Sequence, residues 1–298
     1  MTQSRQIRVT VACELLPFLI GVAPGMSRKQ AKSLLRFGAV TLKGAKDVRH
    51  DTRLAPGDVV TIAIGKPAND AMLEHHSLAI VHLDDAVVVV DKPAGLLSMG
   101  SEREKEKTAH RILNDYLKAL TNSPQQQAYI VHRLDRETSG LMMFARTESI
   151  QAALQRNWKN VTKKYLAVVV GVPSNPQGTL RDNLIESKSF KVHRVDKGGE
   201  LAITHYRVIS SYGNKSLLQL ILETGRKNQI RVQLAAAGHP IMGDRKYGSG
   251  ADAAKRLALH SHELKFAHPI SGLPMEFGSA VPAPMKALIE RRNVARAK

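Results

Sequence analysis

Short apolar runs rich in β-branched residues recur through the larger part of the chain and alternate with amphipathic stretches. The strand-like runs lie at 78–83, 86–93, 129–134, 141–146, 165–171 and 217–224. The stretches with helical character lie at 110–120, 149–159 and 229–238. Because several strand-like runs follow one another with short turns, the pattern predicts an α+β domain whose sheet is mixed and largely antiparallel, with flanking helices.

A different pattern occupies the N-terminal part. A helix is predicted between Ser27, a candidate N-cap, and Gly38, which stands where a left-handed residue ends a helix. Its basic positions recur every four residues: Arg28, Lys32 and Arg36. Its apolar positions form the opposite stripe: Ala31, Leu34 and Leu35. One face is therefore basic and the other belongs to a core, and strands are expected at 39–42 and within 54–64.

The charge balance indicates which class of partner the protein binds. Lys and Arg number 44 against 26 Asp and Glu, a formal net charge of +18. A surplus of this size is typical of proteins that bind nucleic acid or an anionic membrane surface. No stretch approaches the ~20 consecutive apolar residues that span a bilayer. We therefore expect a nucleic-acid partner and no membrane association.

Several other classes are excluded by missing motifs. The single cysteine, Cys13, rules out an internal disulfide and a cysteine-rich metal site. The twelve histidines show no ligand cluster, and the phosphate-binding GxxxxGK[ST], HExxH and GxSxG motifs are missing. Residues 1–10 are polar and do not read as a secretory signal. We expect a cytoplasmic monomer without a metal or cofactor.

The charge and the chain-breaking residues suggest the domain boundaries. Residues 1–66 hold 11 Lys and Arg against 4 Asp and Glu, which makes them a small basic domain. Residues 67–76 are rich in Pro, Asn and Asp without an apolar period, and are predicted to be a linker. A larger domain is expected at 77–290, and residues 291–298 form a basic tail.

The N-terminal pattern resembles the S4-type RNA-binding domain over about residues 9–66. The matching positions are Ser27-Arg28, Leu34-Leu35, Gly38, Val40, Gly57-Asp58 and Val60, with Lys43-Gly44 at the family's turn. The resemblance implies an S4-like α/β domain whose basic helix contacts RNA phosphates. The expected contacts are Arg28, Lys29, Lys32 and Arg36. The alternative is a solvated amphipathic helix without a ligand.

Residues 129–147 carry the candidate chemistry. Two apolar runs enclose a dense polar stretch in which Asp135 lies between Arg133 and Arg136. A strand, a charged loop and a second strand can hold a carboxylate rigidly at the edge of a core, and such a carboxylate suits a role as acceptor or nucleophile. Taken as spacing alone, the same residues also fit a capped, salt-bridged turn.

The complete string HRLDRETSG, residues 132–140, closely resembles the signature of the RluA-type pseudouridine synthases. That resemblance implies that Asp135 is the catalytic nucleophile and that Arg133 helps to hold the target nucleotide out of the RNA stack. Thr138 completes the loop and is expected among the substrate contacts. The resemblance further implies the pseudouridine synthase fold over about residues 77–290, with 258–269 as a late strand.

Three further stretches extend the match. Residues 87–100 resemble the family's Asp-Lys-Pro-x-Gly segment, with Lys92 expected to bind substrate. Tyr165 stands at the position of the active-site tyrosine that stacks on the base and is implicated in proton transfer. Arg231 falls on the arginine that pairs with the catalytic carboxylate, and Ile230 on the apolar residue lining the uracil pocket. Two positions depart from the family: Asn228 and Gln233 stand where it often has histidine, and they can hydrogen-bond but carry no charge.

The resulting hypothesis is an enzyme that isomerises uridine to pseudouridine in structured RNA. The reaction needs no redox change, which agrees with a chain lacking nucleotide and metal motifs. Ribosomal RNA is preferred over tRNA as the substrate because an S4-type domain is common among family members acting on ribosomal RNA. One alternative is a non-catalytic RNA-binding or ribosome-assembly protein on the same scaffold. A second is an RNA-dependent hydrolase or nuclease that uses Asp135 with His132 as a general base.

Overall fold

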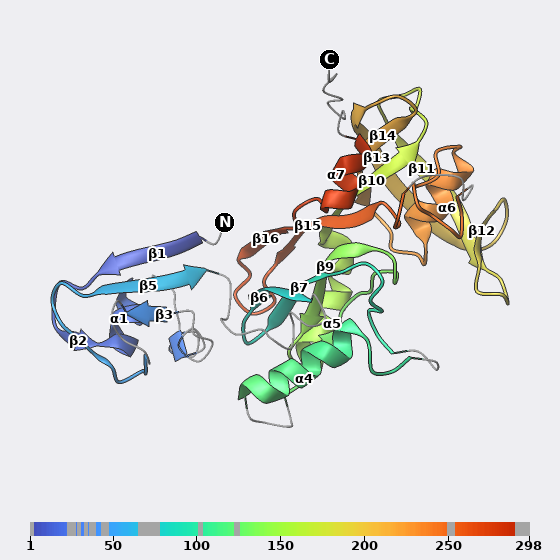
Figure 1. Ribbon diagram of the computed structural model, residues 1–298. Coiled ribbons are helices and arrows are strands. Elements are labelled where there is room, and N and C mark those ends of the chain that lie inside the picture. Colours follow the sequence, from blue (N-terminus) through green and yellow to red (C-terminus); the bar gives the residue numbers. More distant parts are fainter. Residues whose placement is uncertain are drawn as a thin grey trace, which may run out of the picture.

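A computed structural model of the chain describes the following residues: 3–22, 28, 31–32, 35, 40–42, 48–64, 78–100, 104–121, 126–248 and 254–289 (Figure 1). The predicted linker at 67–76 and the predicted tail at 291–298 lie outside these ranges, as do Lys29 and Arg36. The basic helix is therefore described only at some of its positions.

Eleven of the described strands form one mixed sheet (Figure 1). Its main path runs β12-β11-β13-β14-β10-β15-β9-β7-β6, with β16 beside β15 and β8 beside β9. The strand bounds are β6 Ala79–Leu83, β7 Val87–Lys92, β8 Tyr129–Ile130, β9 Ser139–Ala145, β10 Thr162–Val170, β11 Gln177–Glu186, β12 Val192–Val195, β13 Glu200–Ser211, β14 Lys215–Leu222, β15 Leu259–Ala267 and β16 Pro274–Gly278. Among the described pairings of this sheet, β15 and β9 run parallel and the others antiparallel, which confirms the predicted mixed, largely antiparallel sheet.

Helices flank this sheet: α4, α5 and α6 lie where the amphipathic stretches predicted them, whereas α7 was not predicted. Their bounds are α4 Ala109–Thr121, α5 Glu148–Arg156, α6 Gln229–Ala236 and α7 Ala283–Ile289, with a 3₁₀ turn, η1, at Trp158–Asn160. The Thr147 side chain caps the start of α5 by accepting a hydrogen bond from the backbone N–H of Ile150 at 3.2 Å. None of the described helices has the length and apolar character to cross a membrane.

The centre of the sheet is buried on both faces. Alternate residues of β7 and β9 face two different hydrophobic clusters: Val88, Val90, Met142 and Phe144 belong to one, and Val87, Val89, Leu141 and Met143 to the other. Strands buried on both faces read as continuous apolar runs. This packing makes β9 a rigid support for the loop that precedes it.

Some strands differ from the sequence prediction. The run at 129–134 is a strand only at Tyr129–Ile130, after which the chain enters the polar loop. Strands β11, β12, β13 and β16 were not predicted. Most residues of β11 and β16 are exposed or half-buried, so these strands lack the apolar run on which the prediction depended.

The N-terminal residues have a hydrophobic cluster of their own, made only of residues between Ile7 and Ile62. A three-stranded sheet contains β1 Gln3–Arg8, β5 Val59–Ile64 and β3 Val40–Leu42. Helix α1 Leu15–Val22 and a short pair of strands, β2 Cys13–Glu14 and β4 Arg53–Leu54, complete the described part. Ala31 is fully buried in the cluster whereas Arg28 and Lys32 are exposed. For these described positions, the predicted division into an apolar and a basic face is confirmed.

Candidate active site

A cavity of about 270 Å³ lies where the 131–138 loop meets strand β10 and the start of helix α6. The residues predicted for catalysis or substrate binding that line it are Arg133, Asp135, Thr138, Tyr165, Ile230 and Arg231. They come from segments up to about a hundred positions apart in the sequence, and the sheet topology brings them together. Lys92 is the predicted site residue that does not line this cavity.

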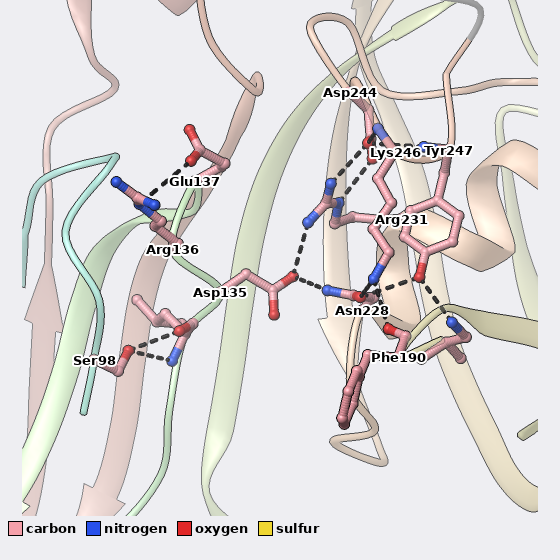
Figure 2. A network of polar contacts seen from close by, with 12 residues as sticks. Ser98, Asp135, Arg136, Glu137, Phe190, Asn228, Arg231, Asp244, Lys246 and Tyr247 are labelled. Carbon is pink, nitrogen blue, oxygen red and sulfur yellow. Dashed lines mark hydrogen bonds and ion pairs between the residues drawn. The ribbon is translucent and has the colours of Figure 1, made fainter. Parts of the chain in front are cut away.

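The backbone on either side of Asp135 is fixed by the 92–98 segment. The Ser98 hydroxyl donates to the carbonyl of Leu134 at 2.7 Å and accepts from the N–H of the same residue at 3.0 Å (Figure 2). On the other side, the N–H of Gly95 donates to the carbonyl of Arg136 at 2.8 Å. The loop that carries the carboxylate therefore has little freedom to move.

Lys92, predicted to bind substrate, lies buried beneath the site in this structure. Its side chain is fully buried, and its ammonium donates to the carbonyls of Pro93, Leu96 and Arg136 at 3.0, 2.8 and 3.3 Å. Burial lowers the pKa of Lys92 to about 7, although the charge of Asp135 acts in the opposite direction. Its contacts join the 92–98 segment to the loop of Asp135, and its role in substrate binding stays a prediction.

The motif glycine Gly140 allows β9 to approach β15 closely. Its φ is +109°, and a Cβ atom there would lie 2.2 Å from the carbonyl oxygen of Ser261. The residue pairs Ser139 with His260 and Gly140 with Ser261 form the parallel contact between the two strands. A side chain at this position would separate β9, the strand that supports Asp135, from β15.

The Asp135 carboxylate is held through one of its two oxygens. Its Oδ2 accepts from Asn228 Nδ2 at 2.5 Å and from Arg231 Nη1 at 3.3 Å (Figure 2). Its Oδ1 makes no hydrogen bond to any described residue, and the side chain is 22% exposed. One oxygen is thus fixed by donors while the other remains for a ligand in the cavity.

A buried ion pair orients the arginine. Arg231 donates through Nε and Nη2 to the two oxygens of Asp244 at 2.8 and 2.7 Å. Burial alone would lower the pKa of Arg231, but the hydrogen bonds and charge of Asp244, together with Asp135, raise it. The bidentate geometry fixes the plane of the guanidinium group and leaves Nη1 directed at Asp135.

Asn228 has a fixed orientation as well. It precedes α6 in the left-handed conformation, with φ of +53°. Its Oδ1 accepts from the hydroxyl of Tyr247 at 3.1 Å and from Lys246 Nζ at 3.3 Å, which leaves its amide nitrogen to donate to Asp135. Asn228 therefore supplies a hydrogen bond to the carboxylate without a charge of its own. The second departure from the family, Gln233, lies outside the cavity and donates to Asp182 at 2.9 Å.

Tyr165 and Ile230 also line the cavity. Tyr165 is 7% exposed and lies at a bulge in the pairing of β10 with β15. Burial raises its pKa to about 12, although a hydrogen bond with Ser261 acts against this shift, so the phenol stays protonated at neutral pH. Ile230 adds an apolar side chain to the lining. Arg133 is exposed at the cavity and makes no hydrogen bond or ion pair within the described part of the chain.

His132 does not fit a general base. Its Nε2 accepts from the backbone N–H of Met143 at 3.0 Å, and its ring stacks on Trp158 with centroids 4.5 Å apart. Burial, with a smaller effect of Lys163, lowers its pKa to about 3. The lone pair that a base would use is already engaged. The described residues also contain no group of three or more His, Cys, Asp or Glu arranged to hold a metal ion.

Sequence reasoning did not assign a role to several residues of this network: Ser98, Asp244, Lys246 and Tyr247. Asp244 had a signal, because the pair Gly243-Asp244 belongs to the third matching stretch. Gly243 has φ of +75°, and a Cβ there would lie 2.0 Å from the carbonyl oxygen of Arg256. The glycine therefore allows the close turn that directs Asp244 inward.

Comparisons with known proteins agree with this geometry. The family model for RNA pseudouridylate synthase matches residues 86–236, which include Asp135, Tyr165 and Arg231. The chain is 34% identical over 284 residues to the uncharacterized RNA pseudouridine synthase YlyB of Bacillus subtilis, covering 93% of each protein. It is 33% identical over 279 residues to ribosomal large subunit pseudouridine synthase D of Vibrio cholerae, covering 87% of this chain and 85% of that protein.

A solved structure resembles the fold. Human RNA pseudouridylate synthase domain containing 4 superposes with a TM-score of 0.59 at 26% identity, covering 70% of this chain and 90% of that one. The matched family region contains the loop of Asp135 and extends to the end of α6, and Asn228 and Arg231 lie at the start of that helix. This chain belongs to the RNA pseudouridylate synthase family.

Proposed function

We propose that Asp135 is the catalytic nucleophile and that the enzyme converts uridine to pseudouridine in ribosomal RNA rather than in tRNA. The observation that carries the proposal is the asymmetry of the carboxylate. Arg231 and Asn228 donate to Oδ2, whereas Oδ1 has no partner among the described residues. An oxygen kept available in this way, beside a cavity of base-binding character, is what a nucleophile requires.

The chemistry can be followed atom by atom. As the bond between C1′ and uracil N1 breaks, its electron pair stays on N1, and Asp135 Oδ1 bonds to the electron-poor C1′, as carboxylates do in glycoside hydrolysis. The detached uracil turns within the cavity, its C5 bonds to C1′, and the bonding pair returns to the carboxylate. The proton on C5 is lost and N1 gains one, so substrate and product are isomers.

The other residues have separate tasks in this scheme. Arg231 pairs with the carboxylate and holds its orientation, because the bidentate contact with Asp244 fixes the guanidinium group itself. Tyr165 covers the base and keeps it in the cavity while it turns. Flipping a base out of folded RNA costs a few kcal/mol, which protein contacts must supply. Arg133, exposed and without a partner among the described residues, is suited to hold the extruded nucleotide.

The preference for ribosomal RNA rests on the relatives and on the basic N-terminal residues. Several relatives that are 31–36% identical carry the name ribosomal large subunit pseudouridine synthase D. We further propose that residues 1–66 form an S4-type domain that holds distant phosphates. Arg28 and Lys32 are exposed, as such contacts require. The sequence predicts RNA contacts at Lys29 and Arg36 as well, and both lie outside the described residues.

A non-catalytic RNA-binding or ribosome-assembly protein on the same scaffold is the alternative, and it predicts a damaged site. The ion pair of Arg231 with Asp135 and the buried Tyr165 beside it count against that alternative.

The test is a map of pseudouridines in cellular RNA with and without this gene. We expect the loss of a defined site, or a few sites, in large-subunit ribosomal RNA. An unchanged map would refute the enzymatic proposal. A loss confined to tRNA would leave the enzyme in place and overturn the proposed substrate.

A further inference from the structure

Phe190 has an unusual backbone and an unusual exposure. It lies in the turn between β11 and β12, where its N–H donates to the carbonyl of Ser187 and the N–H of Ser187 donates to the carbonyl of Lys191, both at 2.9 Å. Its φ is +60°, so it occupies the left-handed position of a three-residue hairpin loop, where glycine is the usual residue. Its side chain is 71% exposed.

Packing does not account for this residue. A bulky side chain in the left-handed region is strained, and one exposed to this degree recovers little free energy from burial. Strain of this kind persists where surrounding contacts enforce it and is concentrated at binding and catalytic sites. Among the described residues, Phe190 and Asn228 are the two non-glycine residues with positive φ. Asn228 is already part of the active site.

One lysine joins these two residues. Lys246 Nζ donates to the carbonyl of Phe190 at 2.8 Å and to Oδ1 of Asn228 at 3.3 Å (Figure 2). Asn228 in turn donates to Asp135. In Figure 2 the aromatic ring of Phe190 takes no part in the polar network. Phe190 is therefore held at the rim of the active site by a contact chain that begins at the proposed nucleophile.

The surroundings of the ring are cationic. Lys227 Nζ lies 5.4 Å from its centroid and pairs with Glu186 at the end of β11. A second cavity, of about 190 Å³, shares Asp135 with the first. Its basic lining consists of Arg133, Arg136, Lys227, Arg231 and Lys246. The groove thus leads from Asp135 to the same two lysines that contact Phe190.

An exposed aromatic ring beside a cationic groove is the arrangement that binds unpaired nucleotides, because every base offers a face for stacking and the cations follow the backbone. We propose that Phe190 is a stacking platform for the base adjacent to the target uridine, with Lys227 and Lys246 contacting the phosphate between the two nucleotides. The proposal rests on the proposed function in one respect: Asp135 marks the position of the target uridine.

The experiment measures stacking directly. The probe is a short single-stranded RNA with a central uridine and the fluorescent base 2-aminopurine on its 5′ or its 3′ side, since stacking on an aromatic ring quenches 2-aminopurine. Wild-type protein should quench one of the two probes. Phe190→Gly should abolish that quenching and weaken binding by about 5- to 150-fold, the range for loss of one base stack. Phe190→Trp should retain both.

Stability separates a binding role from a structural one. Because glycine accepts the left-handed conformation, Phe190→Gly should unfold at the same temperature as the wild type or higher, even though it binds RNA less tightly. Tyr212→Ala is the matched control, since Tyr212 is an exposed aromatic residue in another hairpin, at 45% exposure, and it should change neither quenching nor affinity.

The outcomes decide between the claims. No quenching of either probe by wild type, or equal quenching by wild type and Phe190→Gly, overturns the platform. An unfolding temperature of Phe190→Gly clearly below that of the wild type would indicate a structural role instead. None of these readouts requires turnover. Asp135→Asn separates this proposal from the proposed function. If this variant is inactive and still quenches the probe, the result supports the stacking platform. If the variant is active, the result refutes the proposed nucleophile and leaves the platform in place.

Discussion

The hydrogen bond from Asn228 to Asp135 offers a prediction whose size follows from the structure. The amide nitrogen lies 2.5 Å from Oδ2, and its position is fixed by Tyr247 and Lys246. Hydrogen bonds to a charged group contribute about 1.5–3 kcal/mol. If this hydrogen bond holds the orientation of the Asp135 carboxylate in the transition state, its removal should lower kcat/KM by about 10- to 150-fold. The conversion is 1.36 kcal/mol for each factor of ten.

The informative substitutions respect the backbone. Asn228→Gly removes the side chain and keeps the left-handed conformation, which Asn228→Ala would strain. Asn228→Asp keeps the shape and replaces the donor with a second carboxylate beside Asp135. We expect Asn228→Asp to be slower than Asn228→Gly, because two carboxylates at this distance repel.

The assay follows tritium on C5 of uracil in the substrate RNA, because forming the C5–C1′ bond releases it. Single-turnover rates exclude effects on product release. Asn214→Gly serves as the control, since Asn214 is exposed in a turn away from the cavity and should retain the wild-type rate. A rate for Asn228→Gly within about twofold of wild type would refute the reasoning, because it lies below the change that a loss of 1.5 kcal/mol produces. An Asn228→Asp rate above that of Asn228→Gly would contradict the expected repulsion between the two carboxylates.

Three further predictions concern separate parts of the chain. Gly140→Ala should lower the free energy of unfolding by about 2–6 kcal/mol, because the new methyl group overlaps the Ser261 carbonyl and φ is +109°. Denaturant unfolding measures this loss, and a loss below about 1 kcal/mol would contradict the prediction. Tyr165→Phe should leave the shape of the pH–rate profile unchanged at pH values well below about 12. The reason is that burial raises the pKa of Tyr165 to about 12, so the phenol keeps its proton there. A limb of the profile that is present in the wild type and missing in the variant would contradict this, because it would show that the phenol titrates in the working range. Lys32→Ala should lower RNA affinity and reduce the slope of log K against log salt by about 1, without changing the unfolding temperature; an unchanged slope would remove Lys32 from the proposed RNA contacts.

The sequence predicted the parts of the fold that depend on local pattern. Strands β7 and β9 are buried on both faces and appear as continuous apolar runs, and helix α4 appears as an amphipathic period. Strands β11 and β16 carry few buried residues, so their pairing depends on neighbours distant in the sequence. The resemblance supplied Asp135, Tyr165 and Arg231, and the structure places all three around one cavity.

What the sequence could not supply is the direction of individual side chains. Lys92 matches a family motif, but the structure buries its ammonium among three carbonyls, which no local pattern reveals. From the sequence, Asn228 is an asparagine at a position where the family often has histidine, which can carry a charge. Its contacts show instead that it donates a neutral hydrogen bond to the Asp135 carboxylate. Phe190 gave no signal at all, because its interest lies in its backbone conformation and exposure. Each depends on contacts that form only when distant segments fold together.

The most direct test of the central claim is the rate of pseudouridine formation by Asp135→Asn. The substitution keeps the size of the side chain and removes the nucleophilic charge, so binding of the substrate RNA should stay within about threefold of wild type, well under the 1.4 kcal/mol that a tenfold change represents. The variant should form no detectable pseudouridine in the tritium-release assay. Turnover near the wild-type rate in a correctly folded Asp135→Asn protein would contradict the account.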